Sequence, residues 1–336
     1  MRPIGHKILL KKPNEKKPAM NQKKPYSKTN KYAIPLLRDI RFWRIAGQAL
    51  MIIVVLITLG ILWDNLTYNL ERLNLDFGFD FLGQQAAFDI GERPLSYERT
   101  DAYGRAMFIG ILNSLRVIVI GIILATLLGI TIGIARLSDN WLVRRLAIFY
   151  VETIRNTPLL LQLFFWYFAI FLAFPPPDKP INLLGILGFS NKGLDIATLH
   201  LSSEFSALLF GLTTYTAAFI AEIVRAGLQA VPKGQWEAAK ALGLKPDLAM
   251  RLVIFPQALR VIIPPLTSEY LNLAKNSSLA IAVAYPDVYS VYSTTLNQTG
   301  RSVEVILLLM FTYLSFNLII SLFMNWFNKT VQIKER

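Results

Sequence analysis

Polar side chains interrupt one apolar stretch of this sequence that is long enough to cross a membrane. They recur at intervals of three and four residues, the spacing of one helix face: Ser268, Glu269, Asn272, Lys275 and Asn276. An ionisable group within a membrane span costs about 2.5–3.5 kcal/mol on insertion scales, so such a face must contact protein or water rather than lipid. The pattern predicts a polar path or gate through the helices, or alternatively structural ion pairs and subunit contacts.

A second group of polar residues lies in two other apolar stretches. Glu152, Arg155 and Asn156 come just before Pro158, and Glu222 lies near the end of another stretch. Proline cannot continue a helix without a kink, which frees backbone carbonyls of the preceding turn. We expect these residues to contribute to the same path or gate.

Other chemistry is excluded by composition and spacing. The chain has no cysteine, and His6 and His200 have no partner at metal-ligand spacing, so we expect no metal site, no bound cofactor and no enzymatic centre. A phosphate-binding loop needs two glycines four residues apart followed by Lys-Ser/Thr. Gly188 and Gly193 have that spacing, but neither they nor any other glycine precedes a lysine. Any ATP must bind to another subunit.

The elements that position these residues are membrane helices. The 336 residues are 54% hydrophobic and 17% charged, with a mean hydropathy of +0.42. Soluble domains carry about 25% charged residues. We predict an all-α integral membrane protein of about six spans, at residues 45–63, 107–135, 147–173, 205–226, 264–285 and 303–327.

Positive charge sets the expected orientation. Residues 1–44 hold 13 Lys/Arg, which we interpret as a disordered basic tail rather than a nucleic-acid site. With this tail in the cytoplasm, cytoplasmic segments hold 25 Lys/Arg and outer segments hold 7. Both ends, including 329–336, are therefore predicted inside. Residues 64–106 carry eight acids and are expected outside, as a small external elaboration or interfacial helix.

The cytoplasmic loop 231–263 carries the most informative pattern. Gln235–Leu242 is a run of helix formers, and Gly243 follows where a left-handed residue ends a helix. Pro246 suits the first turn of a second helix. The short first helix carries small residues and one acid, a combination that suits a groove on another protein.

This loop resembles the EAA loop of ABC importer permeases. That pattern reads Glu-Ala-Ala, three residues, Gly, nine residues, Ile, one residue, Leu-Pro. Here it corresponds to Glu237-Ala238-Ala239, Gly243 and Val253-Ile-Phe255-Pro256, with two apolar replacements and the spacing intact.

Residues 107–328 also resemble the permeases of polar and general L-amino-acid importers, which have a type I core of five helices. The resemblance rests on these segments: Asn113-Ser-Leu-Arg116, Glu152-Thr-Ile-Arg-Asn-Thr-Pro-Leu159, Ala221-Glu-Ile-Val-Arg-Ala-Gly227, Pro256-Gln-Ala-Leu-Arg260 and Lys275-Asn-Ser-Ser-Leu279. The tail, the first span and residues 64–106 lie outside this core.

The resemblance implies a set of partners and one docking surface. Coupling to a separate ATPase, which binds Mg-ATP, is expected from Gln235, Glu237, Ala238, Ala239, Gly243 and Pro256. It also implies a second permease subunit, a periplasmic amino-acid-binding protein, an amino-acid substrate, membrane lipid and a bacterial inner-membrane location. A gradient-driven secondary transporter or channel is the main alternative. A membrane-embedded enzyme would need a nucleophile and base that the spans lack.

Overall fold

The computed structural model describes residues 40–72, 77–183, 187–196 and 199–331. The chain divides into two units, Met1–Asn74 and Leu75–Arg336. The described part of the first unit is the helix α1, Ile40–Arg72. It contains the predicted first span and continues nine residues beyond it into the segment expected outside. The predicted basic tail and the C-terminal residues 332–336 lie outside the described residues.

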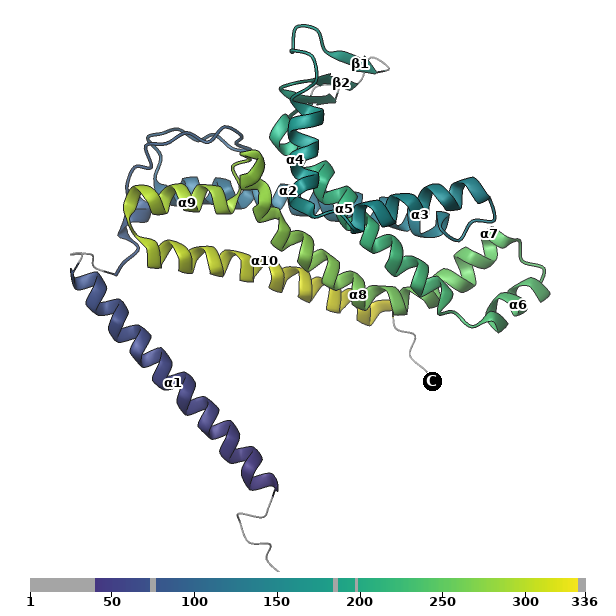
Figure 1. Cartoon of the computed structure of the whole chain (residues 1–336), viewed down its shortest axis with the longest axis horizontal. Coiled ribbons are helices and arrows are strands. Elements are labelled where there is room, and N and C mark those ends of the chain that lie inside the picture. Colours follow the sequence, from purple (N-terminus) through teal and green to yellow (C-terminus); the bar gives the residue numbers. More distant parts are fainter. Residues whose placement is uncertain (1–39, 73–76, 184–186, 197–198, 332–336) are drawn as a thin grey trace, which may run out of the picture. The chain divides into compact units, whose positions relative to one another are not determined.

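The second unit is a helical bundle with a small sheet (Figure 1). Its long helices are α2 (Tyr103–Ala135), α5 (Ser203–Gln229), α8 (Phe255–Asn276) and α10 (Ser302–Val331). Shorter helical elements lie between them: η2 (Asp80–Gly83), α3 (Trp141–Arg155), α4 (Leu159–Phe164), η3 (Phe165–Phe171), α6 (Lys233–Ala241), α7 (Pro246–Ala249), η4 (Met250–Ile254), η5 (Ser277–Val283) and α9 (Val288–Thr299).

Five helical stretches among the described residues are long and apolar enough to cross a membrane. They are Phe42–Asn69, Tyr103–Ala135, Ser203–Gln229, Pro246–Val283 and Ser302–Val331. The predicted fifth span thus extends back through α7 and η4 into the loop, so the second loop helix and the span form one continuous element.

The predicted third span, 147–173, is divided. Helix α3 ends at Arg155 and α4 begins at Leu159, with Pro158 at the break. Proline has no N–H and its ring clashes with the carbonyl four residues earlier, here that of Ile154. The Gln162 Nε2 donates to the carbonyl oxygens of Ile154 and Thr157, both at 2.9 Å. The expected kink is therefore a helix break whose free carbonyls are bonded by a side chain.

Two predicted loops contain regular structure. The segment 174–204, predicted to lie outside, holds four antiparallel strands in the order β1-β2-β3-β4: Ile181–Leu183, Leu187–Ser190, Gly193–Ile196 and Leu199–Ser202. This small sheet is an addition to the predicted helical fold. Gly193 has φ of +136°, and a Cβ there would lie 1.9 Å from the Leu201 carbonyl oxygen, so the sheet needs glycine. The segment 286–302 contains α9, which begins at an Asp287 cap and ends at Gly300 with φ of +69°.

Residues 77–102, which were predicted to be external, form an ordered loop. Phe81, Ile90 and Tyr97 are each 2% exposed. Burial raises the pKa of Tyr97, so its hydroxyl stays protonated and donates to the Phe88 carbonyl oxygen at 3.0 Å. Within 77–102 the short 3-10 turn η2 is the only helix, so the interfacial helix considered for this segment does not occur there.

Helices α2 and α5 form the centre of the bundle, and glycines set their spacing. A Cβ at Gly129 would lie 2.6 Å from the Ile220 Cβ. A Cβ at Gly133 would lie 2.8 Å from the Val224 Cβ and 2.9 Å from the Ala221 carbonyl oxygen. Small residues in such positions let membrane helices approach closely, where van der Waals packing holds them.

Adding a methyl group at this contact should destabilise the bundle. We expect Gly133→Ala to reduce the free energy of unfolding by about 1–3 kcal/mol, the usual effect of overpacking. Gly91→Ala is the control, because a Cβ there meets nothing within 4 Å. Thermal unfolding in detergent measures both variants. Equal midpoints for the two would contradict the packing argument.

Candidate functional site

Four of the predicted pathway residues meet at one cavity of about 410 Å³. Glu152 and Arg155 come from the last turn of α3, and Asn156 caps that helix. Glu222 comes from α5, near its end. The break at Pro158 ends α3 at this point and thereby places its polar last turn beside α5.

The cavity has charges of both signs. Its lining includes the carboxylates of Glu152 and Glu222 and the guanidinium groups of Arg136 and Arg155. Glu222 pairs with Arg136 at the end of α2 and with Arg225 one turn further along α5. Arg155 Nη1 lies 4.0 Å from Glu222 Oε2. One partly buried carboxylate thus joins the ends of α2, α3 and α5.

One wall of the cavity is aromatic. The guanidinium of Arg155 lies over the ring of Phe219, 5.1 Å from its centroid. A cation within about 6 Å of a ring centroid is attracted to the ring face. The remaining apolar wall is Val151, which is 1% exposed. The cavity therefore combines carboxylates, guanidinium groups and a ring face.

Sequence reasoning missed Arg136 and Phe219 as parts of this site. Arg136 is the first charged residue after the apolar run of α2, a position from which a side chain can reach a helix end. Phe219 precedes Glu222 by three residues, so the two share a face of α5. The position of Arg136 after the apolar run was visible in the sequence, but its partner Glu222 lies 86 residues away.

The other four predicted pathway residues form a stripe on α8. Asn272 and Lys275 are exposed in the single chain, and Glu269 and Asn276 are half-buried. Glu269 interacts with the side chain of Asn272 and with the charge of Arg155. The stripe therefore begins beside the cavity and continues along an uncovered face, which also includes Pro264 and Pro265.

The predicted docking residues lie together around α6 and the start of α8. Gln235, Glu237 and Ala238 are exposed on α6, whereas Ala239 is 2% exposed and faces inward. The small residues of this helix therefore divide between two faces, and only part of them can contact another protein. The Gln257 Nε2 donates to Gln235 Oε1 at 3.1 Å and joins α6 to α8.

The end of α6 matches the prediction. Gly243 adopts φ of +73° directly after the helix, and Pro246 begins α7. Pro256, the last predicted docking residue, is exposed near the start of α8. Leu242 is 80% exposed beside Gly243. A cavity of about 360 Å³ separates α6 from α7 and is lined by Trp236, Glu237, Lys240, Leu244, Pro246 and Ala249. This end of the bundle lies opposite α9 (Figure 1).

Comparison with known proteins identifies the family. The profile of the family "binding-protein-dependent transport system inner membrane component" matches residues 105–333, more than half of the chain. The chain belongs to this family. It is the multi-pass inner-membrane component of a transport system and not an enzyme, which confirms the predicted resemblance to importer permeases. Among the described residues, no group of three or more acidic, histidine or cysteine side chains could hold a metal ion.

Relatives match this permease over nearly their full length. A putative amino-acid ABC transporter permease, YhdX of Escherichia coli K12, is 39% identical over 88% of this chain and 95% of the relative. The general L-amino acid transport system permease AapQ of Rhizobium johnstonii is 37% identical over 85% of this chain and 92% of its own. These alignments extend beyond the family profile into the N-terminal third of the chain.

Solved structures share the fold. An amino acid ABC transporter crystallised with histidines is 27% identical, with a TM-score of 0.54 over 68% of this chain and 95% of that chain. The MetNI methionine ABC transporter in an inward-facing conformation is 18% identical, with a TM-score of 0.53 over 68% and 97% of the two chains. The type I permease fold expected from the sequence is confirmed.

The ion pairs of Glu222 should stabilise the permease. We expect Glu222→Gln to lower the free energy of unfolding by about 1–3 kcal/mol, less than the 3–5 kcal/mol typical of fully buried pairs because the carboxylate is partly exposed. Thermal unfolding of Glu222→Gln, Arg136→Gln and the double variant forms a double-mutant cycle. Strictly additive effects would contradict a direct interaction between the two side chains.

Proposed function

We propose that this permease forms the translocation pathway of an ATP-driven amino-acid importer in the inner membrane of a bacterium. The observation that carries the proposal is the cavity of about 410 Å³ whose lining holds two carboxylates and two guanidinium groups. The names of the relatives, all amino-acid transport permeases, support the same substrate class.

The charges of the cavity suit a zwitterion. Arg155 and Arg136 offer donors to an α-carboxylate, and arginine binds carboxylates with two parallel hydrogen bonds. Glu152 and Phe219 offer a carboxylate and a ring face to an α-ammonium group. Both charged ends are common to all amino acids, and a volume of about 410 Å³ falls within the usual range of small-ligand sites.

Energy is proposed to come from separate ATPase subunits, which bind Mg-ATP. The exposed face of α6 with Gly243 and Leu242 is the docking surface. Because α5 leads through three residues into α6, movement of the docked helix would pull directly on the end of α5 that carries Glu222. The same movement reaches α2 and α3 through the ion pairs of Glu222.

A second permease subunit is proposed to cover the polar stripe of α8. Lys275 and Asn272 are exposed in a helical stretch that is long and apolar enough to cross the membrane. Exposure of such groups to lipid is costly, so protein or water must lie against this face. A paired permease would supply the protein, and the two facing stripes would enclose a polar path that holds water. An extracytoplasmic amino-acid-binding protein would deliver substrate to the end opposite α6.

Loss of the Arg155 charge should reduce uptake of all amino acids alike. We expect Arg155→Gln to lower uptake of a labelled amino-acid panel by about tenfold, because one charge-assisted hydrogen bond to the common carboxylate is lost. Arg145→Gln is the matched control, because Arg145 is exposed on the same helix. A decrease confined to amino acids with acidic side chains would contradict recognition of the α-carboxylate.

Gly243→Asp should uncouple the transporter. At φ of +73° a non-glycine residue is strained, and a carboxylate enters the docking surface. We expect uptake to fall several-fold at unchanged membrane levels. Gly234→Asp adds the same charge on α6 at an unstrained position with open space around it, so uptake should fall less with this variant. Normal uptake with Gly243→Asp would favour a gradient-driven transporter.

A further inference from the structure

The polar residues of the Asn113–Arg116 segment hold together the end of the bundle opposite α6. With one residue of the external loop they form a group that we name the outer clamp: Glu92, Asn113, Ser114 and Arg116. None of these side chains lines the cavity at Glu222. Glu92 also precedes the residues that match the family profile.

The first part of the outer clamp is an ion pair between the external loop and α2. Arg116 Nη1 lies 3.0 Å from Glu92 Oε1. The other carboxylate oxygen of Glu92 accepts a hydrogen bond from Ser202, the cap residue of α5. The Arg116 guanidinium also lies over the Phe205 ring, 4.9 Å from its centroid. One side chain of the external loop thus joins α2 to the start of α5.

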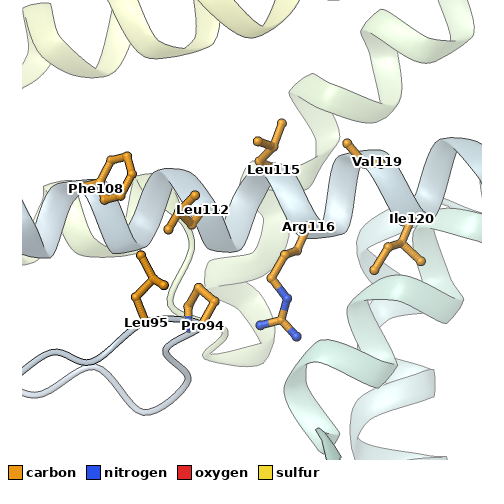
Figure 2. Close-up of a pocket in the computed structure, with 8 residues that line it drawn as sticks. All are labelled: Pro94, Leu95, Phe108, Leu112, Leu115, Arg116, Val119 and Ile120. Carbon is orange, nitrogen blue, oxygen red and sulfur yellow. The ribbon is translucent and has the colours of Figure 1, made fainter. Parts of the chain in front are cut away.

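Apolar surroundings strengthen this pair. Figure 2 shows Arg116 pointing from α2 toward the external loop, beside Pro94 and Leu95. These residues line a cavity of about 510 Å³ whose other walls are apolar side chains of α2: Phe108, Leu112, Leu115, Val119 and Ile120. Charges interact more strongly beside low-dielectric walls than in water. The Glu92 side chain is only 17% exposed.

The second part of the outer clamp binds the turn between η5 and α9. The Asn113 Nδ2 donates to the carbonyl oxygens of Pro286 and Glu92, both at 2.8 Å. The Val288 N–H donates to Ser114 Oγ at 3.0 Å. Gly110 permits this approach, because a Cβ there would lie 3.2 Å from the Asp287 carbonyl oxygen. Asn113 and Ser114 are both 0% exposed.

The turn itself begins at the left-handed end of η5. Ala284 adopts φ of +57°, a left-handed conformation that is uncommon for a residue other than glycine. Strained residues of this kind occur at switch regions, where the surrounding structure holds them. The helical stretch that begins beside α6 ends at this turn, and α9 continues from it.

We propose that the outer clamp holds the outer end of the permease closed between transport events and opens as a unit when substrate enters. The inference rests on the proposed function, since only a transporter needs to open this end. Three elements meet at the clamp: the external loop, the start of α5 and the turn before α9. The loop and the turn are hydrogen-bonded to α2, and the start of α5 is hydrogen-bonded to Glu92 of the loop. Water can replace these hydrogen bonds, so the junction can open reversibly.

Cysteine labelling tests the outer clamp directly, because the natural chain has no cysteine. Ala280 is 0% exposed and packs under the clamp with Val117, Phe205 and Tyr285. In intact cells that contain the complete transporter, an impermeant maleimide should label Ala280→Cys slowly. Adding Glu92→Gln should raise the labelling rate about tenfold, the effect on a two-state equilibrium of losing one charge-assisted hydrogen bond.

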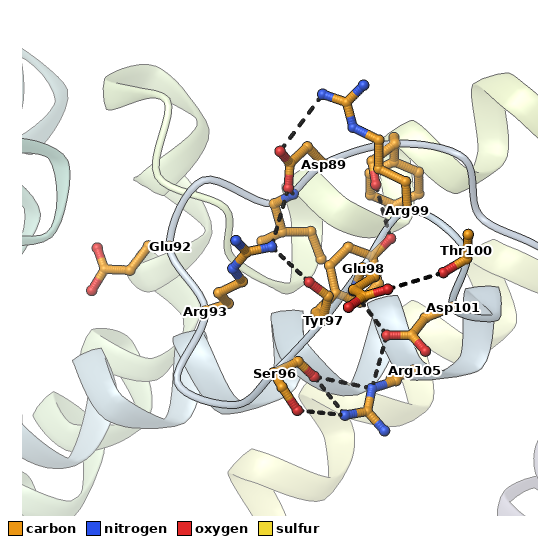
Figure 3. Close-up of polar contacts among 12 residues, drawn as sticks. Asp89, Glu92, Arg93, Ser96, Tyr97, Glu98, Arg99, Thr100, Asp101 and Arg105 are labelled. Carbon is orange, nitrogen blue, oxygen red and sulfur yellow. Dashed lines mark hydrogen bonds and ion pairs between the residues drawn. The ribbon is translucent and has the colours of Figure 1, made fainter.

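Matched variants separate opening from other effects. Asp89→Asn is the control for Glu92→Gln: it removes a charge from the same loop, where Asp89 forms ion pairs with the exposed Arg93 and Arg99 (Figure 3). His200→Cys, on an exposed strand, should label rapidly in every background and verifies that this end lies outside. Ala218→Cys, buried in the middle of α5, should stay unlabelled and reports general unfolding.

The outcomes decide the proposal. Faster labelling of Ala280→Cys with Glu92→Gln alone supports the clamp. Unchanged labelling, an equal increase with Asp89→Asn, or parallel labelling of Ala218→Cys would overturn it. If Glu92→Gln does not accumulate in the membrane, Ser114→Ala carries the test with the same expected rise. Labelling needs neither ATP nor an amino acid, so the two proposals can fail separately. If the clamp opens in a permease that takes up no amino acid, the proposed function is refuted and the clamp is not.

Discussion

The close contact of α2 and α5 is the constraint on which the rest of this permease depends. Lipid offers no hydrophobic driving force between helices, so the contact relies on shape, and Gly129 and Gly133 allow the backbones to approach. Both regions that we propose to be functional include residues at the ends of these two helices. Near the outer end, α2 carries Arg116 beside the start of α5. At the other end, Arg136 follows α2 and pairs with Glu222 of α5. A rigid pair of helices thus connects the outer clamp to the charged cavity.

The two ends of the α2–α5 pair are held by polar contacts, whereas its middle is held by van der Waals packing. Buried apolar contacts at the glycines have no polar alternative, whereas the ion pairs of Glu92 and Glu222 are partly exposed and can exchange with water. This division suits a transporter, because the centre of the bundle must persist while its ends rearrange. Glu222 lies seven residues before the end of α5, and α6 follows after a short connection. The proposed docking of a partner at α6 and the proposed opening of the outer end would therefore act on the same helices.

Structural features set by neighbouring residues could be predicted from the sequence, whereas contacts between residues far apart in the chain could not. The apolar stretches, the helix before Gly243 and the break at Pro158 follow from residues within a few positions of one another. The sheet was missed because its four strands alternate over only three or four residues, which is too short a run to predict a strand, and because their pairing sets the register. Glu222 was identified as a candidate, but its partner Arg136 is 86 residues away. The contacts of Glu92 depend in the same way on the folded chain. Helix α9 had two local signals in the sequence, a capping residue at Asp287 and a terminating glycine at Gly300. They were overlooked because this helix has only twelve residues and lies in a predicted loop.

The central claim is that this permease moves amino acids at the expense of ATP hydrolysed by a partner. Reconstitution of the purified transporter into liposomes, with labelled amino acids and the binding protein on one side and Mg-ATP on the other, tests it most directly. We expect accumulation against a gradient that requires ATP and the binding protein and persists when proton and sodium gradients are collapsed. Accumulation driven by either ion gradient without ATP would contradict it.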